Sequence, residues 1–225
     1  MNTLRMAWLI AEKDLRVEWR TKEIILTTAL FGILVVILSS LSFYLNPTMS
    51  RRVAPGVLWV AIAFAGVLSL GRSWGRERDN DAMRGLLLSP VPRPSIYLGK
   101  WLSGFILLTA IEAILIPLVA IFFHLDLTPL AWPLAAIVGL GTTGFVAAGT
   151  LFSALSARGG ARDLLLSVVV FPLIAPALLS AVVATRELLA GAPLSETFEW
   201  LRILGAFDII FLAGGYTLFG PIISD

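Results

Sequence analysis

The chain has 225 residues, of which 58% are hydrophobic and 14% are charged. A soluble domain usually carries about a quarter of its residues as charged side chains, so this composition excludes an ordinary soluble domain and predicts an integral membrane protein. With no cysteine and a single histidine, His124, disulfides and multi-histidine metal centres are excluded, and at most one histidine could ligate haem. We expect neither a metal site nor a nucleic-acid partner, and we interpret His124 as a solvated interfacial residue.

Residues 3–21 are typical of an amphipathic helix. Apolar residues recur at spacings of three and four along this stretch, and charged residues fall on their flank. Two of the apolar residues, Trp8 and Trp19, are of the type that favours the membrane interface. We therefore expect a helix that lies flat on the cytoplasmic surface, with Trp8 and Trp19 as anchors. The alternative is a solvent-exposed helix that packs on a partner.

Six apolar runs follow, each long enough to cross a membrane, for which about 20 helical residues suffice. They cover residues 24–44, 53–70, 101–123, 130–155, 164–184 and 201–222. Pro172 and Pro176 lie inside the fifth run, where each removes a backbone donor and is expected to kink the helix. Both are candidates for a translocation path or for a helix contact. The predicted fold is all-α, a single transmembrane domain over 1–225 with six spans and an N-terminal interfacial helix.

The distribution of Lys and Arg predicts the orientation of the spans. The N-terminal segment, the 72–100 stretch and the turn near 160 together hold 13 basic residues, and the remaining connections hold 4. Basic residues concentrate on the cytoplasmic side of membrane proteins. Both termini and the 72–95 region are therefore predicted to be cytoplasmic, and the connections near 48, 126 and 192 to face outward.

The cytoplasmic segment 72–95 is rich in charged residues of both signs. Each of its charged side chains would cost about 2.5–3.5 kcal/mol in hydrocarbon, so the segment must lie in water or among headgroups. It closes on a short apolar run and three prolines, at Leu86, Leu87, Leu88, Pro90, Pro92 and Pro94. We expect a short helix with an apolar tip that docks on a soluble partner. The alternative is an ordinary polar loop between two spans.

Two acidic residues lie inside predicted spans, where a carboxylate is costly unless it is paired, protonated or beside a wet cavity. Glu112 is near the middle of the third run and Asp208 is in the last. For Glu112, a place in a translocation path and a hydrogen bond to a neighbouring helix both remain open. For Asp208, we favour an interface or capping contact, for example with Arg202 or Arg186.

Nucleotide-binding and catalytic motifs are missing from the sequence. The phosphate-binding pattern G-x-x-x-x-G-K-[ST] does not occur, since the pair Gly99-Lys100 has Pro94 in place of the first glycine and Trp101 in place of the hydroxyl. With one histidine, a Ser/His/Asp set is also not expected. The chain is therefore predicted to be non-catalytic.

The central stretch resembles the permease subunits of type-2 ABC exporters. The shared pattern is E-R-x-x-x-x-x-x-x-L-L-x-x-P…G-K, which here comprises Glu77, Arg78, Leu86, Leu87, Pro90, Gly99 and Lys100. Two further blocks, Val53 to Ala61 and Arg158 to Leu179, are similar to the haem exporter protein B family of bacterial cytochrome c maturation. Together these blocks and the span count cover most of the chain.

This resemblance implies a homodimer in the bacterial inner membrane, bound to two copies of an ABC ATPase, cytochrome c maturation protein A. Two further proteins of the same maturation system, the haem-handling protein C and the small protein D, would complete the complex. The central stretch would be the coupling helix that contacts the ATPase, through Arg76, Glu77, Arg78, Leu86, Leu87, Leu88, Ser89 and Pro90.

The resemblance also implies where the cofactors lie. ATP and magnesium would be bound by the partner, this chain would bind no cofactor, and haem would be the cargo of the complex. The ATP-driven step would export or deliver haem, or release a haem-loaded chaperone at the outer face. The alternatives are a type-2 exporter permease for a lipid, glycan or drug, and a structural scaffold without a moving part.

Overall fold

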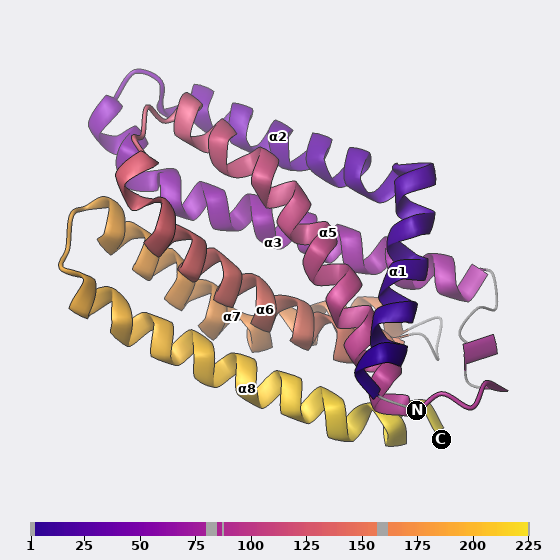
Figure 1. Ribbon diagram of the computed structural model, residues 1–225. Coiled ribbons are helices and arrows are strands. Elements are labelled where there is room, and N and C mark those ends of the chain that lie inside the picture. The colour runs from indigo at the N-terminus through magenta and orange to yellow at the C-terminus, as the bar shows by residue number, and fades with distance from the viewer. Residues whose placement is uncertain (1–2, 80–84, 87, 157–161, 225) are drawn as a thin grey trace.

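The computed structural model describes residues 3–79, 85–86, 88–156 and 162–224, except for the side chains of 78–79, 155–156, 162–171, 194 and 224. All regular secondary structure in this part of the chain is helical (Figure 1). Its elements are α1 (Thr3–Thr21), α2 (Glu23–Phe43), α3 (Pro47–Asp79), α5 (Arg93–Phe122), the 3₁₀ turn η1 (Thr128–Leu130), α6 (Ala131–Ser156), α7 (Arg162–Leu189) and α8 (Leu194–Ser224). Gly85, Leu86 and Leu88 are also helical, on either side of Leu87, which lies outside the described residues.

Six of these helices, α2, α3, α5, α6, α7 and α8, are long and apolar enough to cross a membrane. The predicted all-α fold with six membrane spans is thereby confirmed, and the chain is a multi-pass membrane protein. The two termini lie at the same end of the bundle (Figure 1), as an even number of spans requires. That this end faces the cytoplasm remains a prediction from the basic residues.

Several helices extend beyond the apolar runs that predict them. Helix α3 continues from the apolar run through the charged residues to Asp79, and α5 begins at Arg93. The polar stretch 185–200, expected to be an external connection, is helical except at residues 190–193. A hydrogen bond of 2.8 Å from Trp200 Nε1 to Glu187 Oε2 joins the ends of α7 and α8 there. Polar residues can continue a helix outside the membrane because the backbone bonds are internal to the helix.

Helix α6 is the most buried of the six spans. Its glycines leave room for bulky side chains of neighbouring helices: Gly141 faces Trp59 of α3, Gly149 faces Leu70 of α3 and Gly144 faces Phe207 of α8. Small residues at such contacts allow membrane helices to approach closely, which increases van der Waals packing. The core therefore forms around α6.

Helix α1 lies across one end of the bundle and packs on α5 (Figure 1). The expected bounds, 3–21, coincide with the helix, but its apolar residues do not form one lipid-facing stripe. Ala11 is fully buried against the bundle, whereas Trp8 and Trp19 are 54% and 79% exposed. The helix thus packs on its own chain and leaves both tryptophans free. Their role as membrane anchors remains a prediction.

The two prolines of the fifth span lie within a continuous helical segment, because α7 runs through both of them. Pro172 and Pro176 are exposed on the surface of this helix. The carbonyl of Pro176 accepts a hydrogen bond of 2.8 Å from the Ser180 hydroxyl. Kinks at these positions and a role in a translocation path stay predictions.

Candidate functional site

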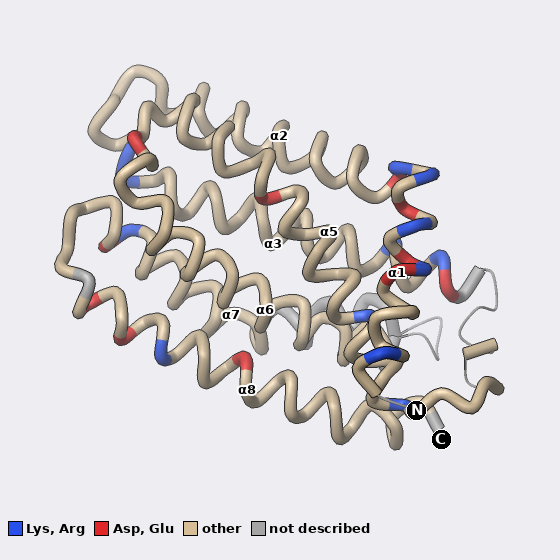
Figure 2. Tube along the Cα trace, in the orientation of Figure 1, with Lys and Arg blue, Asp and Glu red and all other residues tan. Residues whose placement is uncertain are grey.

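Four charged side chains from three helices meet at the end of the bundle where α1 lies. Lys100 Nζ of α5 lies 2.5 Å from Glu77 Oε1 of α3 and 2.7 Å from Asp14 Oδ2 of α1. Lys13 Nζ of α1 lies 3.0 Å from the same Glu77 oxygen and 3.0 Å from Asp14 Oδ1. We call these four residues the Lys100 network. Figure 2 shows charged residues gathered at α1 and the adjoining helix ends.

The Lys100 network joins segments that are far apart in the sequence. Glu77 lies in the last turn of α3 and Lys100 lies in the second turn of α5, so the two residues belong to the helix ends that flank residues 80–92, which we call the central segment. Asp14 adds the middle of α1 to the same contact. The network therefore holds α1 and the two helix ends that flank the central segment as one unit.

Burial makes this arrangement sensitive to the loss of any one charge. The Lys100 side chain is 2% exposed, and those of Glu77 and Asp14 are 9% and 11% exposed. Taking ions out of water costs several kcal/mol each, which close oppositely charged partners offset. The two basic and two acidic groups balance in charge. Burial lowers the pKa of Lys13, but the negative charges of Asp14 and Glu77 and hydrogen bonds to both raise it more, so its pKa lies above the ordinary value.

The residue before Lys100 explains how α1 comes close enough to join the network. A Cβ atom at Gly99 would lie 2.7 Å from Ile10 Cβ and 2.8 Å from the carbonyl oxygen of Ala7. Both distances are shorter than a non-bonded contact allows, so only glycine fits where α1 crosses α5. Gly99 therefore allows α1 to pack closely on α5, and Lys100 then pairs with Asp14 of α1.

A second buried carboxylate, that of Glu18, holds the turn between α1 and α2. Its Oε1 accepts hydrogen bonds from the backbone N–H groups of Ile24 and Ile25, at 2.8 and 3.0 Å. These donors belong to the first turn of α2, which has no partner within the helix for them. Arg76 of α3 pairs with the other Glu18 oxygen at 3.3 Å and with Glu23 at 3.4 Å. Glu18 therefore caps α2 and ties it to α3.

The residues predicted to contact an ATPase fall into three groups. Arg76 pairs with Glu18 and Glu23, and Glu77 belongs to the Lys100 network. Leu86 packs with the small core between α5 and α8, whereas Leu88 is 89% exposed. The Ser89 hydroxyl donates to the carbonyl of Leu86 at 2.7 Å, and Pro90 is exposed. The side chain of Arg78 and all of Leu87 lie outside the described residues.

The two acidic residues inside the spans both contact α6. Glu112 is 1% exposed, and its Oε1 accepts a hydrogen bond from the Thr142 hydroxyl. Asp208 is 5% exposed and lies against Gly144. Within the described residues, Asp208 forms no ion pair with Arg186 or Arg202, the partners suggested from the sequence. Both residues therefore make helix contacts in this chain, and a role in translocation remains a prediction.

The sequence contains a signal for the Lys100 network that the apolar stripe alone does not reveal. Ala7, Ala11, Asp14 and Glu18 recur at spacings of four, three and four, which places them on one face of α1. Small residues followed by acidic ones on one face indicate a face that packs closely and then meets basic groups. The identity of those basic groups comes only from the tertiary structure.

Comparison with known proteins places the chain in a family. A family model described as "CcmB protein" matches residues 5–215. The "Heme exporter protein B" of Escherichia coli K12 is 32% identical over 216 residues, which cover 95% of this chain and 93% of that protein. The protein of the same name from Haemophilus influenzae is 30% identical over 202 residues, 89% of each chain. The resemblance seen in the sequence is thereby confirmed, and the chain belongs to the CcmB protein family.

Proposed function

We propose that this chain is the non-catalytic membrane component of an ABC exporter complex for cytochrome c maturation in the bacterial inner membrane. It would couple ATP hydrolysis by cytochrome c maturation protein A to the export or delivery of haem, or to release of a haem-loaded chaperone. A second copy of the chain, the haem-handling protein C and the small protein D would complete the complex. The relatives named as haem exporters support haem as the cargo.

The observation that carries this proposal is the Lys100 network. A soluble ATPase can move membrane helices only if the segment it contacts is held firmly to those helices. Glu77 and Lys100 join the helices on both sides of the central segment through a 2.5 Å ion pair. Displacement of this segment would then shift α3, α5 and α1 together, as in a rigid-body transition.

The arrangement of the apolar residues in the central segment supports contact with a partner. Leu86 is packed against the bundle, and Leu88 projects into solvent from the same short helical stretch. Because Leu86 is packed, the backbone beside it is already held in place, so less conformational entropy is lost when a partner covers Leu88. We infer that Leu88 and Pro90 contact the ATPase directly, while Arg76 and Glu77 hold the segment from within.

The Leu88→Asp variant in the assembled complex tests this proposal. Leu88 is almost fully exposed, so the change should leave folding intact and weaken a central interface contact by about 2 kcal/mol or more. ATPase binding and holocytochrome c yield should both fall, at unchanged protein level in the membrane. Leu45→Asp is the matched control, since Leu45 is 94% exposed at the opposite end of the bundle.

Two results would contradict the proposal. Normal cytochrome yield with Leu88→Asp would exclude this contact surface. Purification of the chain with an ATPase but without a haem-handling protein would favour a type-2 exporter of another cargo.

A further inference from the structure

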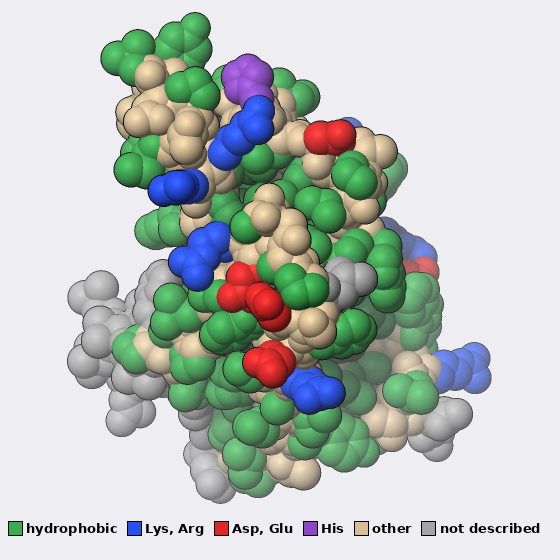
Figure 3. Space-filling model, turned by 90° about the vertical axis from the view of Figure 1, so that its left-hand side faces the viewer, with side chains coloured by type: hydrophobic (Ala, Val, Ile, Leu, Met, Phe, Trp, Pro, Cys, Tyr) green, Lys and Arg blue, Asp and Glu red, His purple; other side chains and the backbone are tan. Residues whose placement is uncertain are grey.

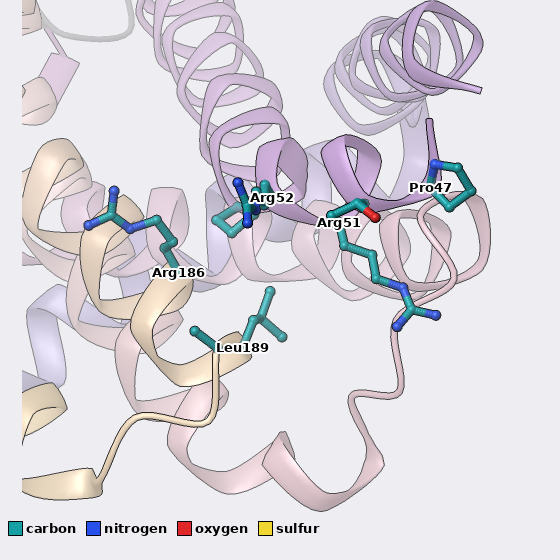
Figure 4. A pocket seen from close by; sticks show the side chains of 8 residues that line it. Pro47, Arg51, Arg52, Arg186 and Leu189 are labelled. Atoms are coloured by element: carbon teal, nitrogen blue, oxygen red, sulfur yellow. The ribbon is translucent and has the colours of Figure 1, made fainter. Parts of the chain in front are cut away.

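A pocket of about 410 Å³ lies at the end of the bundle opposite α1, which we call the distal end. Arg51 and Arg52 of α3 and Arg186 and Leu189 of α7 lie around it (Figure 4). Figure 3, which views the molecule from this end, shows both basic and acidic side chains on the exposed face. The volume lies within the range of about 300–1,000 Å³ that is usual for small-ligand pockets.

The pocket is rich in arginine, although basic residues are few in the connections that the sequence predicts to face outward. Only four basic residues, Arg51, Arg52, Arg186 and Arg202, fall in the connections predicted to face outward. Three of these four line the one pocket, although residues 52 and 186 are more than half the chain apart. Such convergence comes from tertiary packing of α3 against α7.

The three arginines have no acidic partner in the described parts of the chain. No ion pair joins Arg51, Arg52 or Arg186 to a carboxylate there. Glu187, the neighbour of Arg186, instead accepts the hydrogen bond of Trp200. Three like charges around a common space repel one another, so an anion that enters the pocket reduces this repulsion. In Figure 4 the guanidinium groups of Arg51 and Arg186 point away from each other, so direct contact with an anion is expected from one or two of the three side chains.

The backbone adds to this attraction. Pro47, Thr48, Arg51 and Arg52 belong to the first two turns of α3, and all four line the pocket. The first turn of a helix carries a partial positive charge, which favours phosphate and other anions. The N–H groups of Met49 and Ser50 already donate to Asn46, at 3.1 and 2.9 Å, so the helix contributes mainly through this partial charge. The Thr48 hydroxyl is a further donor in the lining.

The remaining wall is apolar and includes Pro55, Leu189 and Ala190. These residues lie where two membrane spans end, at the level where headgroups meet acyl chains. Guanidinium groups bind phosphate through paired hydrogen bonds, and apolar side chains accept the adjoining hydrocarbon. We propose that the distal pocket binds a phosphate group, supplied by the headgroup of an anionic phospholipid or by free phosphate. This inference does not depend on the proposed function.

The test uses the purified full-length chain in detergent, with phosphatidylglycerol and inorganic phosphate as separate probes and chloride as the ionic control. Native mass spectrometry counts bound lipid, and thermal unfolding reports stabilisation by either probe. Arg52→Gln and Arg186→Gln should each weaken binding about tenfold or more, as expected when a charged hydrogen bond is lost. Arg202→Gln removes the same charge at the same end, outside the pocket lining, and should leave affinity unchanged.

The outcomes separate the two sources and can overturn the proposal. Arginine-dependent binding of phosphatidylglycerol that phosphate does not displace identifies a lipid site. Arginine-dependent stabilisation by inorganic phosphate, with no lipid bound, identifies a free-anion site. Binding of neither probe, or an equal effect of Arg202→Gln and Arg186→Gln, would show that the pocket is not a phosphate site. All three substituted arginines are exposed, so their replacement should not prevent folding.

Discussion

Glu77 and Lys100 form a buried ion pair of 2.5 Å that joins the end of α3 to the start of α5. The pair stands at the base of the charged 72–95 segment, which is predicted to lie between two spans on the cytoplasmic side. Since Asp14 shares the same lysine, the amphipathic helix α1 belongs to this unit. The stability of the α1 end of the molecule should therefore depend on a few identifiable atoms.

Replacement of Lys100 by methionine should lower the free energy of unfolding by about 3–5 kcal/mol, because Glu77 and Asp14 would lose their buried counter-charge. Thermal or denaturant unfolding in detergent, followed by tryptophan fluorescence, measures the change. Lys13→Met is the control: its side chain is 44% exposed, and an exposed pair contributes about 0–1 kcal/mol.

The double variant Lys100→Met/Glu77→Gln tests whether the unpaired carboxylates cause this loss of stability. It leaves Asp14 with Lys13 as its counter-charge, so part of the lost stability should return. Equal losses for Lys13→Met and Lys100→Met, or no recovery in the double variant, would show that the buried pair does not control stability.

Substitution of Gly99 by alanine should push α1 away from α5. The added Cβ would lie within 3.0 Å of Ile10 and of the Ala7 carbonyl, and overpacking of this kind costs about 1–3 kcal/mol. Faster hydrogen exchange in α1 should accompany the loss. At Gly75, in the helical interior of α3, a Cβ meets nothing within 4 Å, so Gly75→Ala should instead stabilise by up to about 1 kcal/mol. Similar behaviour of the two variants would contradict this account of Gly99.

Loss of the Thr142 hydroxyl should destabilise the protein, because Glu112 loses its hydrogen-bond donor. Thr142→Val removes the donor to a buried carboxyl group, with an expected cost of about 1–3 kcal/mol in unfolding free energy. Thr143→Val is a close control, because the Thr143 hydroxyl donates to the Gly139 carbonyl of its own helix. Glu112→Gln keeps an acceptor for Thr142, and it should retain stability.

The Glu112→Gln variant also separates the two interpretations of this residue. If Glu112 serves only as a helix contact, cytochrome c yield in cells should be close to normal. A strong loss of yield with unchanged stability would instead assign Glu112 to a translocation path.

Removal of the Glu18 carboxylate should loosen the α1–α2 turn. Glu18→Leu leaves the N–H groups of Ile24 and Ile25 without their acceptor and removes the ion pair of Glu18 with Arg76, at an expected cost of about 1.5–3 kcal/mol. Increased exchange at those two amides would locate the effect. Glu12→Leu on the same helix is the control, since Glu12 pairs with Arg16 on the exposed surface. Unchanged amide exchange in the Glu18 variant would show that water replaces the cap.

Much of the architecture is readable without a structure. Long uncharged runs must lie in the membrane and must be helical there, since each backbone group needs an internal partner in lipid. The six spans and the extent of α1 follow from this rule and from helical periodicity. The lengths of α3, α7 and α8 do not, because outside the hydrocarbon a polar segment is free to continue as a helix or to leave it.

The candidate site, unlike the architecture, could be predicted only in part from the sequence. Composition placed Arg76, Glu77 and Lys100 near the cytoplasmic surface and supported contact with a partner, but it could not tell which side chains face inward. The hydropathy of α1 suggested one apolar face, while Ala11 and Glu18 are in fact buried against the bundle and Trp8 is not.

The sequence by itself determined the membrane class, the number of spans and the family pattern, because these depend on residues that are neighbours along the chain. Only the tertiary structure decided that Asp14, Glu77 and Lys100 share one buried contact, and that Arg52 and Arg186 share one pocket. The physical reason is that both arrangements depend on distances of a few ångströms between segments whose separation in sequence reaches 134 residues, from Arg52 to Arg186. Those distances are set by how glycines such as Gly99 let the helices approach.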